Sequence, residues 1–360
     1  VLTDPTVQHG PIEILITMDE ETGLTGASNL SDKLLDGKIL LNLDSEEDGA
    51  VYIGCSGGKN TTAKFNYTPV APKAGSAGLT IRITGLMGGH SGLNIHEGRA
   101  NAIKLMVRLL WDLEMDFGVQ IGTIKGGSAH NAIPREAFAT VAVEAGKLAA
   151  VKEYVKKYNA IVKEENAVME KNLEVAMEDA AAPATVISAD VQTNLLHALY
   201  ALPHGVYKMS LDIPGLVETS TNLATITTQD GVVSIITSQR SSVASEILDI
   251  ANKVKAVLIL GGADVKQGDG YPGWKPNPAS EVLGLFKDTY KNLYGSVPEV
   301  KAIHAGLECG ILGERYPGMD MISFGPTLHG VHSPDERIEI DTVEKFWDIL
   351  VTMLKNVPKK

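Results

Sequence analysis

The sequence predicts an α/β protein in which one domain is inserted into another. A β-α-β pattern opens the chain, alternating strands and long amphipathic helices fill its middle, and an α/β pattern returns after Gly261-Gly262. The chain has 360 residues, which is too long for one ordinary core and about right for two. We therefore expect a discontinuous α/β domain at 1–68 and 263–360, with an α+β domain inserted at 69–262.

Two buried strands are expected near the start of the chain, at 11–18 and 38–44, with a short helix at 26–35 between them. Each apolar run leads into acids. Glu20 and Glu21 follow the first run, and Asp44 ends the second. Ligands of open α/β sheets bind at the carboxyl ends of the strands, so these acids are candidates for a functional site.

The middle of the chain is expected to combine alternating strands with amphipathic helices. The segment 69–78 holds Pro and Gly residues and is a candidate crossover or hinge. The expected strands are 61–67, 79–85, 132–143 and a hairpin within 222–239 around Asp230-Gly231. The expected helices are 94–116, 147–171 and 242–258.

The end of the chain returns to an α/β pattern. Strands are expected at 300–303 and 319–324, and helices at 280–294 and 341–356. Gly295 follows the first of these helices and is a typical C-terminal cap.

The bulk composition excludes several classes of partner. The formal net charge is −12, which argues against nucleic acids and anionic membranes, since both require basic patches. No run of about 18 apolar residues and no signal peptide occurs in the sequence. The two cysteines, Cys55 and Cys309, do not make a disulfide framework, so a cytoplasmic location is expected.

Clustered acids repel one another, and a bound cation or a shared proton relieves that repulsion. A third candidate segment, residues 325–336, follows the expected strand 319–324 and contains His332. Imidazole and carboxylate ligands together suit zinc, manganese or cobalt. The segments therefore predict a metal site with a carboxylate base. The competing interpretation is a set of solvated acidic loops and an exposed histidine.

Three further side chains have both a functional and a purely structural interpretation. His90, in Gly88-Gly89-His90-Ser91-Gly92, is either accessible to a ligand or part of a tight turn before a helix. Arg240 is either a bidentate ligand of a substrate carboxylate or half of a surface ion pair. Glu308 either begins a short helix or binds a substrate ammonium group.

Seven motifs in order along essentially the whole chain carry a family resemblance. They are residues 17–23 (TMDEETG), 42–47 (NLDSEE), 88–92 (GGHSG), 131–137 (NAIPREA), 271–274 (YPGW), 304–310 (HAGLECG) and 332–336 (HSPDE). With these motifs the chain closely resembles the bacterial cytosolic aminoacyl-histidine (Xaa-His, carnosinase-like) dipeptidases. They belong to the aminoacylase/carboxypeptidase superfamily of di-zinc exopeptidases.

The resemblance implies a catalytic domain with a mixed sheet sandwiched by helices, and an inserted lid and dimerisation domain. It implies a homodimer, two divalent metal ions (zinc, with cobalt or manganese as alternatives) and a dipeptide substrate. The resemblance implies that Glu20 is the general base and that Glu21, Asp44 and His332 are metal ligands. It implies that His90 donates a hydrogen bond to the oxyanion, that Arg240 binds the substrate carboxylate and that Glu308 binds the substrate amine. Asn131 and Asn222 are implied as weaker substrate contacts.

One feature departs from the family pattern. The family supplies a further His-x-Asp motif and a bridging Asp upstream of these motifs, and neither is found here. The sequence begins with Val1, so we expect that an N-terminal segment is missing and that this chain alone forms an incomplete metal centre. Adding the segment should restore tight zinc binding.

The predicted function is a metal-dependent dipeptidase acting on dipeptides with a free N-terminus, such as Xaa-His. One alternative is a related N-acyl-amino-acid amidohydrolase, which would not need an amine-binding acid such as Glu308. Another is a catalytically silent fragment that serves only as a dimerising module. Activity with added zinc separates the last alternative from the other two.

Overall fold

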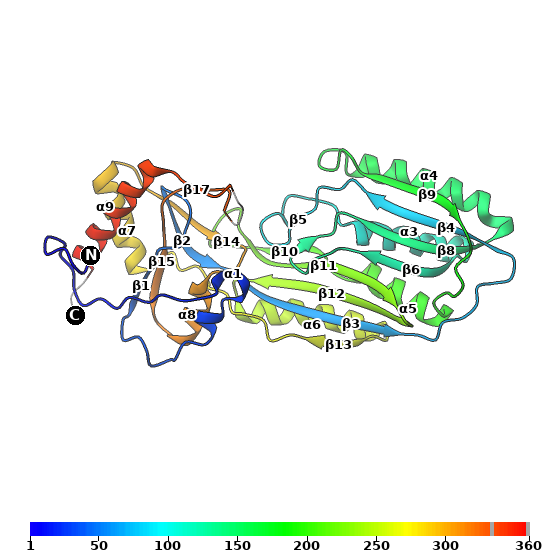
Figure 1. Ribbon diagram of the computed structural model, residues 1–360, viewed down its shortest axis with the longest axis horizontal. Helices are drawn as coiled ribbons and strands as arrows, with labels where there is room; N and C mark the ends of the chain where they lie inside the picture. The colour runs from blue at the N-terminus through cyan, green and yellow to red at the C-terminus, as the bar shows by residue number, and fades with distance from the viewer. Residues whose placement is uncertain (332–334, 358–360) are drawn as a thin grey trace.

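The computed structural model describes residues 1–331 and 335–357, with the side chains of Glu21 and Thr22 left aside. Within these residues the strands form a four-stranded sheet and a nine-stranded sheet, each with its own hydrophobic core. Figure 1 shows the two sheets and their helices as two lobes side by side. We call them the small lobe and the large lobe.

The small lobe is built on a mixed sheet. Its strands, in spatial order, are β1 (Ile39–Asn42), β15 (Asp320–Ser323), β2 (Ala50–Cys55) and β14 (Glu299–Ile303). In Figure 1 this sheet lies between α7 and α9 on one side and α8 on the other. The helices of the lobe are α1 (Glu20–Gly23), α2 (Thr25–Ser28), α7 (Glu281–Tyr294), α8 (Glu308–Arg315) and α9 (Ile340–Asn356), and β16 (Leu328–His329) pairs with β17 (Arg337–Ile338).

The large lobe is built on an antiparallel sheet covered by helices. Its strands, in spatial order, are β13 (Asp264–Gln267), β3 (Gly57–Asn66), β12 (Val232–Ser241), β11 (Val217–Gln229), β6 (Gln120–Gly126), β8 (Ala137–Glu144), β4 (Ser76–Thr84) and β9 (Glu174–Ala180), and β10 (Gly205–Met209) pairs with β11. Its helices are α3 (Ala102–Phe117), α4 (Leu148–Glu165), α5 (Ala189–Ala201) and α6 (Ala244–Leu260), with a short 3₁₀ turn at Ala145–Lys147. A small pair, β5 (Gly89–His90) and β7 (Ala132–Ile133), lies outside the main sheet.

Several predicted elements of the large lobe are confirmed. β11 and β12 form the expected hairpin, and both turn residues, Asp230 and Gly231, have left-handed backbones with φ of 49° and 77°. This is the geometry that a tight two-residue hairpin turn requires. Helix α3 buries its predicted apolar face but starts later than expected. Its N-cap is Asn101, whose side chain accepts the backbone N–H groups of Ile103 and Lys104.

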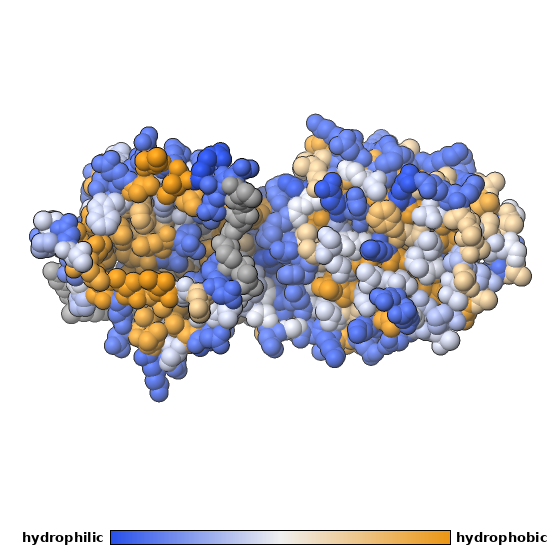
Figure 2. All heavy atoms as spheres, in the orientation of Figure 1, coloured by the Kyte–Doolittle hydropathy of each residue, from blue (hydrophilic) through white to orange (hydrophobic). Residues whose placement is uncertain are grey.

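The prediction of a buried strand at 11–18 is wrong. The segment has no regular secondary structure and pairs with no strand in the described part of the chain. Ile14, Ile16 and Met18 are 62%, 87% and 75% exposed. A strand is stabilised by the hydrogen bonds of a neighbouring strand, so an apolar run alone does not create one. On the face shown in Figure 2, the small lobe carries large hydrophobic areas.

Other boundaries differ from the predictions for local reasons. The expected strand 132–143 is split into β7 and β8 around Pro134, which has no N–H to donate to a ladder. The expected helix at 26–35 shortens to α2. The pattern also missed β2, β6, β9, β10, β13 and α5. No helix among the described residues is long and apolar enough to cross a membrane.

The chain passes between the lobes at a narrow crossing that we call the neck, residues 55–58 and 271–274. The two passages are antiparallel, with bridges from Cys55 to Trp274 and from Gly58 to Tyr271. A Cβ added at Gly57 would lie 2.6 Å from the backbone N of Gly273, so only glycine permits this approach. The neck therefore fixes the ends of β2 and β3 against the returning chain.

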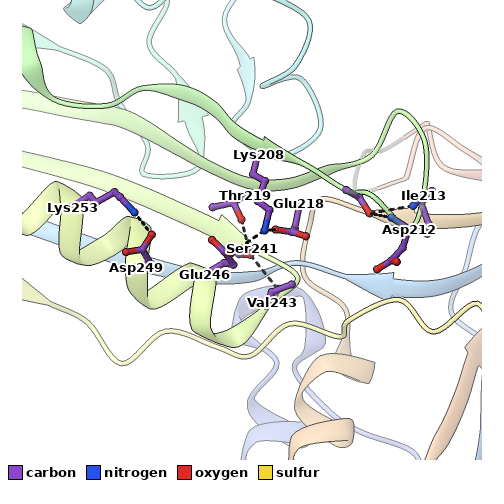
Figure 3. Close-up of polar contacts among 11 residues, drawn as sticks. Lys208, Asp212, Ile213, Glu218, Thr219, Ser241, Val243, Glu246, Asp249 and Lys253 are labelled. Atoms are coloured by element: carbon purple, nitrogen blue, oxygen red, sulfur yellow. Dashed lines mark hydrogen bonds and ion pairs between the residues drawn. The ribbon is translucent and has the colours of Figure 1, made fainter.

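A loop from the large lobe makes a second connection. After β10, the Ser210 hydroxyl accepts the backbone N–H groups of Asp212 and Ile213, both at 3.2 Å, and Ile213 packs against the small-lobe core. The base of the loop is held by Lys208, which forms ion pairs with Glu218 at 3.0 Å and Glu246 at 2.9 Å (Figure 3). The lobes are thus joined by packing as well as by the neck.

The sheet to which each strand belongs indicates where the two domains divide. Strand β3 falls within the expected range 1–68 and β13 within 263–360, yet both belong to the nine-stranded sheet. We therefore propose that the catalytic and inserted domains divide at the neck, rather than at 68 and 263.

Candidate active site between the two lobes

Arg240 lies near the end of β12, beside the neck. Its neighbours across the sheet are Gly58 and Ser220, and its side chain is only 6% exposed. Nη1 donates to the Tyr271 hydroxyl at 3.0 Å, while the buried Nε has no hydrogen-bond partner among the residues that the structure describes. No described carboxylate forms an ion pair with it. A buried guanidinium without an anion is costly, so the position favours an anionic ligand over a surface ion pair.

His90 lies in β5 and faces Arg240. Its Nδ1 accepts the backbone N–H groups of Leu93 at 3.1 Å and Gly92 at 3.3 Å. Burial, followed by the positive charges of Arg240 and His130, lowers the pKa of His90 to about 4. The ring is therefore neutral at pH 7. Since Nδ1 is an acceptor, Nε2 carries the proton.

The two side chains present donors to each other. His90 Nε2 and Arg240 Nη2 are 3.4 Å apart. With Nε2 protonated, neither atom can accept from the other. An oxygen atom placed beside both would receive hydrogen bonds from each of them. The arrangement is therefore suited to an anionic or strongly polarised oxygen.

A second buried histidine joins this group from the small lobe. His304 follows β14, is 6% exposed, and its Nε2 lies 2.7 Å from the Ser220 hydroxyl. Burial, then the charges of Arg240 and His90, lower the pKa of His304 to about 3. The buried Nδ1 has no hydrogen-bond partner among the described residues.

Sequence reasoning missed His304 as a site residue. The available signal was its position directly after an expected strand, which is the same signal that selected Asp44. Gly92 shows how closely the His90 segment approaches it, because a Cβ added there would lie 2.1 Å from the His304 carbonyl oxygen. The large lobe is thus in direct contact with the small lobe at this point.

The two candidate asparagines lie next to His90. Asn222, in β11, donates through Nδ2 to the Ala132 carbonyl at 2.8 Å, and its buried Oδ1 has no partner in the described part of the chain. Asn131 is exposed, and its carbonyl accepts the backbone N–H of Ser91 at 2.8 Å. Both residues therefore support the segment that pairs β5 with β7.

Glu308 is the first residue of α8, as expected. Its Oε2 accepts a hydrogen bond from the Thr17 hydroxyl at 2.9 Å. The other oxygen, Oε1, is buried and has no partner among the described residues. A carboxylate that is half satisfied in this way can accept hydrogen bonds from an ammonium group.

Asp44 lies at the carboxyl end of β1, beside the loop that follows β15. The two strands are parallel neighbours, and a Cβ added at Gly325 would lie 1.6 Å from the Ser45 carbonyl oxygen. Asn42 ties them together, because its Oδ1 accepts the Ser323 hydroxyl at 2.5 Å and the Asp44 backbone N–H at 3.2 Å. Two of the three expected ligand segments therefore meet at one edge of the sheet.

The first acidic segment is positioned differently. Glu20 begins the short helix α1 and is half-buried. The preceding Asp19 has a left-handed backbone, with φ of 60°, and its carboxylate accepts the Thr25 hydroxyl at 2.7 Å. A tight turn, rather than the end of a strand, thus directs these acids.

The described residues alone do not complete a metal site. Among them, no group of three or more His, Cys, Asp or Glu side chains could hold a metal ion. The Glu21 side chain and His332 lie outside the described residues. The donor set of two carboxylates and one imidazole is chemically suited to zinc. Burial raises the pKa of Cys309, as do the nearby charges of Cys55, Glu308 and Asp44. The carboxylates of Glu308 and Asp44 therefore both influence the thiol of Cys309.

The chain is similar to known proteins in both sequence and structure. Residues 81–170 match the M20 peptidase dimerisation domain. The cytosol non-specific dipeptidase of Escherichia coli (strain K12) is 41% identical over 360 residues, which cover all of this chain and 74% of that protein. The crystal structure of aminoacylhistidine dipeptidase from Vibrio alginolyticus aligns with a TM-score of 0.95 and 43% identity, over 100% of this chain and 73% of that one.

Proposed function

The chain belongs to the M20 family of dipeptidases, enzymes that hydrolyse peptide bonds, and on that premise we propose that it is a metal-dependent dipeptidase. Its proposed substrates are dipeptides with a free N-terminus, including Xaa-His and carnosine-like dipeptides. The observation that carries the proposal is the buried Arg240, which has no carboxylate partner among the described side chains.

We propose that Arg240 binds the substrate's C-terminal carboxylate. The guanidinium is held by Tyr271 and by the sheet, so its direction is set before the substrate arrives. A charge-assisted pair with a carboxylate would satisfy the donor that the protein leaves unpaired. The neighbouring neutral His90 and His304 add no negative charge that could compete with the substrate.

We propose that Glu308 binds the substrate's free amine. Its buried Oε1 has no described partner, and its Oε2 is oriented by Thr17. A cation-binding acid and an anion-binding arginine on opposite sides of one site select molecules that carry both charges. If both ends must be bound at once, the length of the substrate is limited, which favours dipeptides over longer peptides. Asn131 and Asn222 are proposed as further substrate contacts.

We propose that Glu21, Asp44 and His332 hold divalent metal, on the chemistry of the donor set described above. The chemistry supplied by two bound ions, proposed to be zinc with cobalt or manganese as alternatives, is polarisation of the scissile carbonyl and acidification of a coordinated water. Glu20 acts as the general base, which takes a proton from the attacking water and passes it to the leaving amine.

His90 is proposed to stabilise the oxyanion. Its Nε2–H is a neutral donor, since Nδ1 already accepts two backbone N–H groups. A donor fixed in position before the reaction stabilises charge that develops on the carbonyl oxygen and needs little reorganisation. In this role His90 touches the reacting atoms, whereas Arg240 contacts only the substrate's carboxylate.

A homodimer formed through the large lobe is part of the proposal, and the match of residues 81–170 to a dimerisation domain supports it. A cytoplasmic location is proposed by analogy with the relative named as a cytosol dipeptidase. Sedimentation velocity of the purified protein tests the dimer directly. A single species with the monomer mass at micromolar concentration would contradict it.

The competing activity is that of an N-acyl-amino-acid amidohydrolase, and the substrate's amine distinguishes the two. We expect the full-length, zinc-loaded protein to cleave Ala-His and to leave N-acetyl-histidine and N-acetyl-Ala-His largely uncleaved. Glu308→Gln should lower kcat/KM for Ala-His by about 10- to 100-fold, the effect of losing a charged hydrogen bond of about 1.5–3 kcal/mol. Equal or faster cleavage of the acetylated compounds would favour the alternative.

A further inference from the structure

The segment 87–100 carries His90 and has only the short strand β5 as regular structure. A catalytic donor on such a segment is useful only if the segment is held in one position. The described contacts show how the segment is held, and the main support comes from a residue far along the chain.

Glu170 lies between α4 and β9 and is 2% exposed. Its Oε2 accepts the backbone N–H of Met87 at 2.7 Å, and its Oε1 accepts that of Ala100 at 2.9 Å. One carboxylate therefore binds both ends of the His90 segment. No basic side chain in the described ranges forms an ion pair with Glu170, so these two N–H groups provide the hydrogen bonds observed for this buried side chain.

The interior of the segment is tied together by its own side chains. Arg99 donates to the Gly88 carbonyl at 2.6 Å and pairs with Glu97 at 2.7 Å. Asn94 accepts the backbone N–H of His90 at 2.9 Å and donates to Glu97 at 2.7 Å. These bonds make the segment a connected unit, so a change at its ends is passed on to His90.

We propose that Glu170 is a positioning residue, which fixes the imidazole of His90 beside Arg240 by holding both ends of segment 87–100. Two acceptor oxygens are required, since each binds a different N–H. A glutamine has the same shape but offers one acceptor and one N–H₂ group, which would face a backbone N–H. The catalytic consequence rests on the oxyanion role proposed for His90, whereas the positioning itself does not.

The experiment compares Glu170→Gln, Glu170→Asp and His90→Ala in the full-length, zinc-loaded protein. We expect Glu170→Gln to lower kcat about 10- to 100-fold, the range seen when a supporting hydrogen bond of a site is lost. KM for Ala-His should change little. NMR titration of the His90 ring should show its pKa moving up from about 4 towards that of a solvated histidine. Glu170→Asp keeps both acceptors and should restore part of kcat.

The matched control is Glu165→Gln. Glu165 ends α4 on the surface, where it pairs with Arg108, and its loss should leave kcat and the His90 titration unchanged. The inference is overturned if Glu170→Gln lowers only the melting temperature, or lowers kcat while the His90 titration stays as in the wild type. If His90→Ala keeps full kcat, the oxyanion role fails, yet a shifted His90 titration in Glu170→Gln still supports the positioning.

Discussion

The two halves of the candidate active site differ in charge and in burial. The half formed around Arg240, His90 and His304 is basic and largely buried. Strand β12 carries Arg240, and its neighbour β11 carries Ser220, which contacts His304. The half that carries Asp44 and Glu308 is acidic and more open, with Asp44 exposed and Glu308 partly buried. Hydrogen bonds within the protein hold the first half in place, whereas in the second half Thr17 holds one oxygen of Glu308 and leaves the other without a partner among the described residues.

This difference indicates what each half requires from outside the protein. A buried guanidinium gains most from a single anionic partner in a fixed direction. Carboxylates gain most from cations, either metal ions or an ammonium group. Each half can be disabled separately, and removal of the metal should have the largest effect on activity.

Metal removal should affect only the acidic half. We expect extensive dialysis against a chelator to reduce dipeptide hydrolysis to background, since the carbonyl would lose its polarising partner. The large lobe should stay folded, because its core is built from apolar residues of α3–α6 and the nine-stranded sheet. Activity and far-UV circular dichroism, before and after zinc is added back, check both expectations. Full activity in protein shown to be metal-free by mass spectrometry would contradict the account.

Arg240→Met should disable the basic half. We expect kcat/KM for Ala-His to fall by about 100- to 1,000-fold, which is about 3–4 kcal/mol and typical of a truncated buried charge pair. Hydrolysis of the Ala-His amide, which lacks the carboxylate, should be affected far less. Arg82→Met is the control, since Arg82 is an exposed partner of Glu178. Equal losses on both substrates would show that Arg240 does not bind the carboxylate.

Acid should destabilise the protein through the buried histidines. Burial lowers the pKa of His304 to about 3 and that of His90 to about 4, well below the ordinary histidine value of 6.5. The unfolded chain therefore binds protons below pH 6.5 that the folded protein does not, and stability falls as pH drops from 6.5 towards these values. At pH 5.5 each such histidine costs about 1.4 kcal/mol.

Urea unfolding at pH 7.5 and pH 5.5 measures this effect. His304→Gln should lose about 1.4 kcal/mol less than the wild type between the two pH values. The control is His197→Gln, at an exposed position in α5. If His304→Gln shows the wild-type dependence on pH, then His304 is not held neutral in the folded protein.

The smallest expected effect is that of Thr17→Val on the acidic half. The change removes the hydroxyl that donates to Glu308, a hydrogen bond worth about 0.5–1.5 kcal/mol. We expect KM for Ala-His to rise by up to about 10-fold with kcat nearly unchanged, since the amine-binding carboxylate is only less well oriented. Thr6→Val serves as the control, because Thr6 bonds only to nearby Asp4. A loss confined to kcat would place Thr17 in the reaction itself.

The sequence predicted the elements whose signals are local. The Asp230-Gly231 hairpin and the helix that ends at Gly295 depend on residues within one turn of the chain, and both are found. The strand at 11–18 failed because a strand depends on a partner that an apolar pattern does not specify. Likewise, the burial of Arg240 depends on β3, β11 and Tyr271, which are distant in sequence.

The candidate site shows the same limit. Local sequence signals selected Arg240, His90 and Glu308. They did not select Glu170, or His304 even though it opens the motif 304–310, because the importance of each comes from a partner far along the chain. His304 bonds to Ser220, and Glu170 bonds to Met87 and Ala100. Pairings of this kind become visible only when the lobes are assembled.

The central claim is that one dipeptide spans the two halves of the site. The most direct test is a crystal structure of the zinc-loaded protein with Ala-His in which the peptide bond is replaced by a non-cleavable reduced amide. The account predicts the ligand carboxylate within about 3 Å of the Arg240 guanidinium and the ligand amine within the same distance of Glu308. A ligand bound in the reverse direction, or with its carboxylate away from Arg240, would contradict the account.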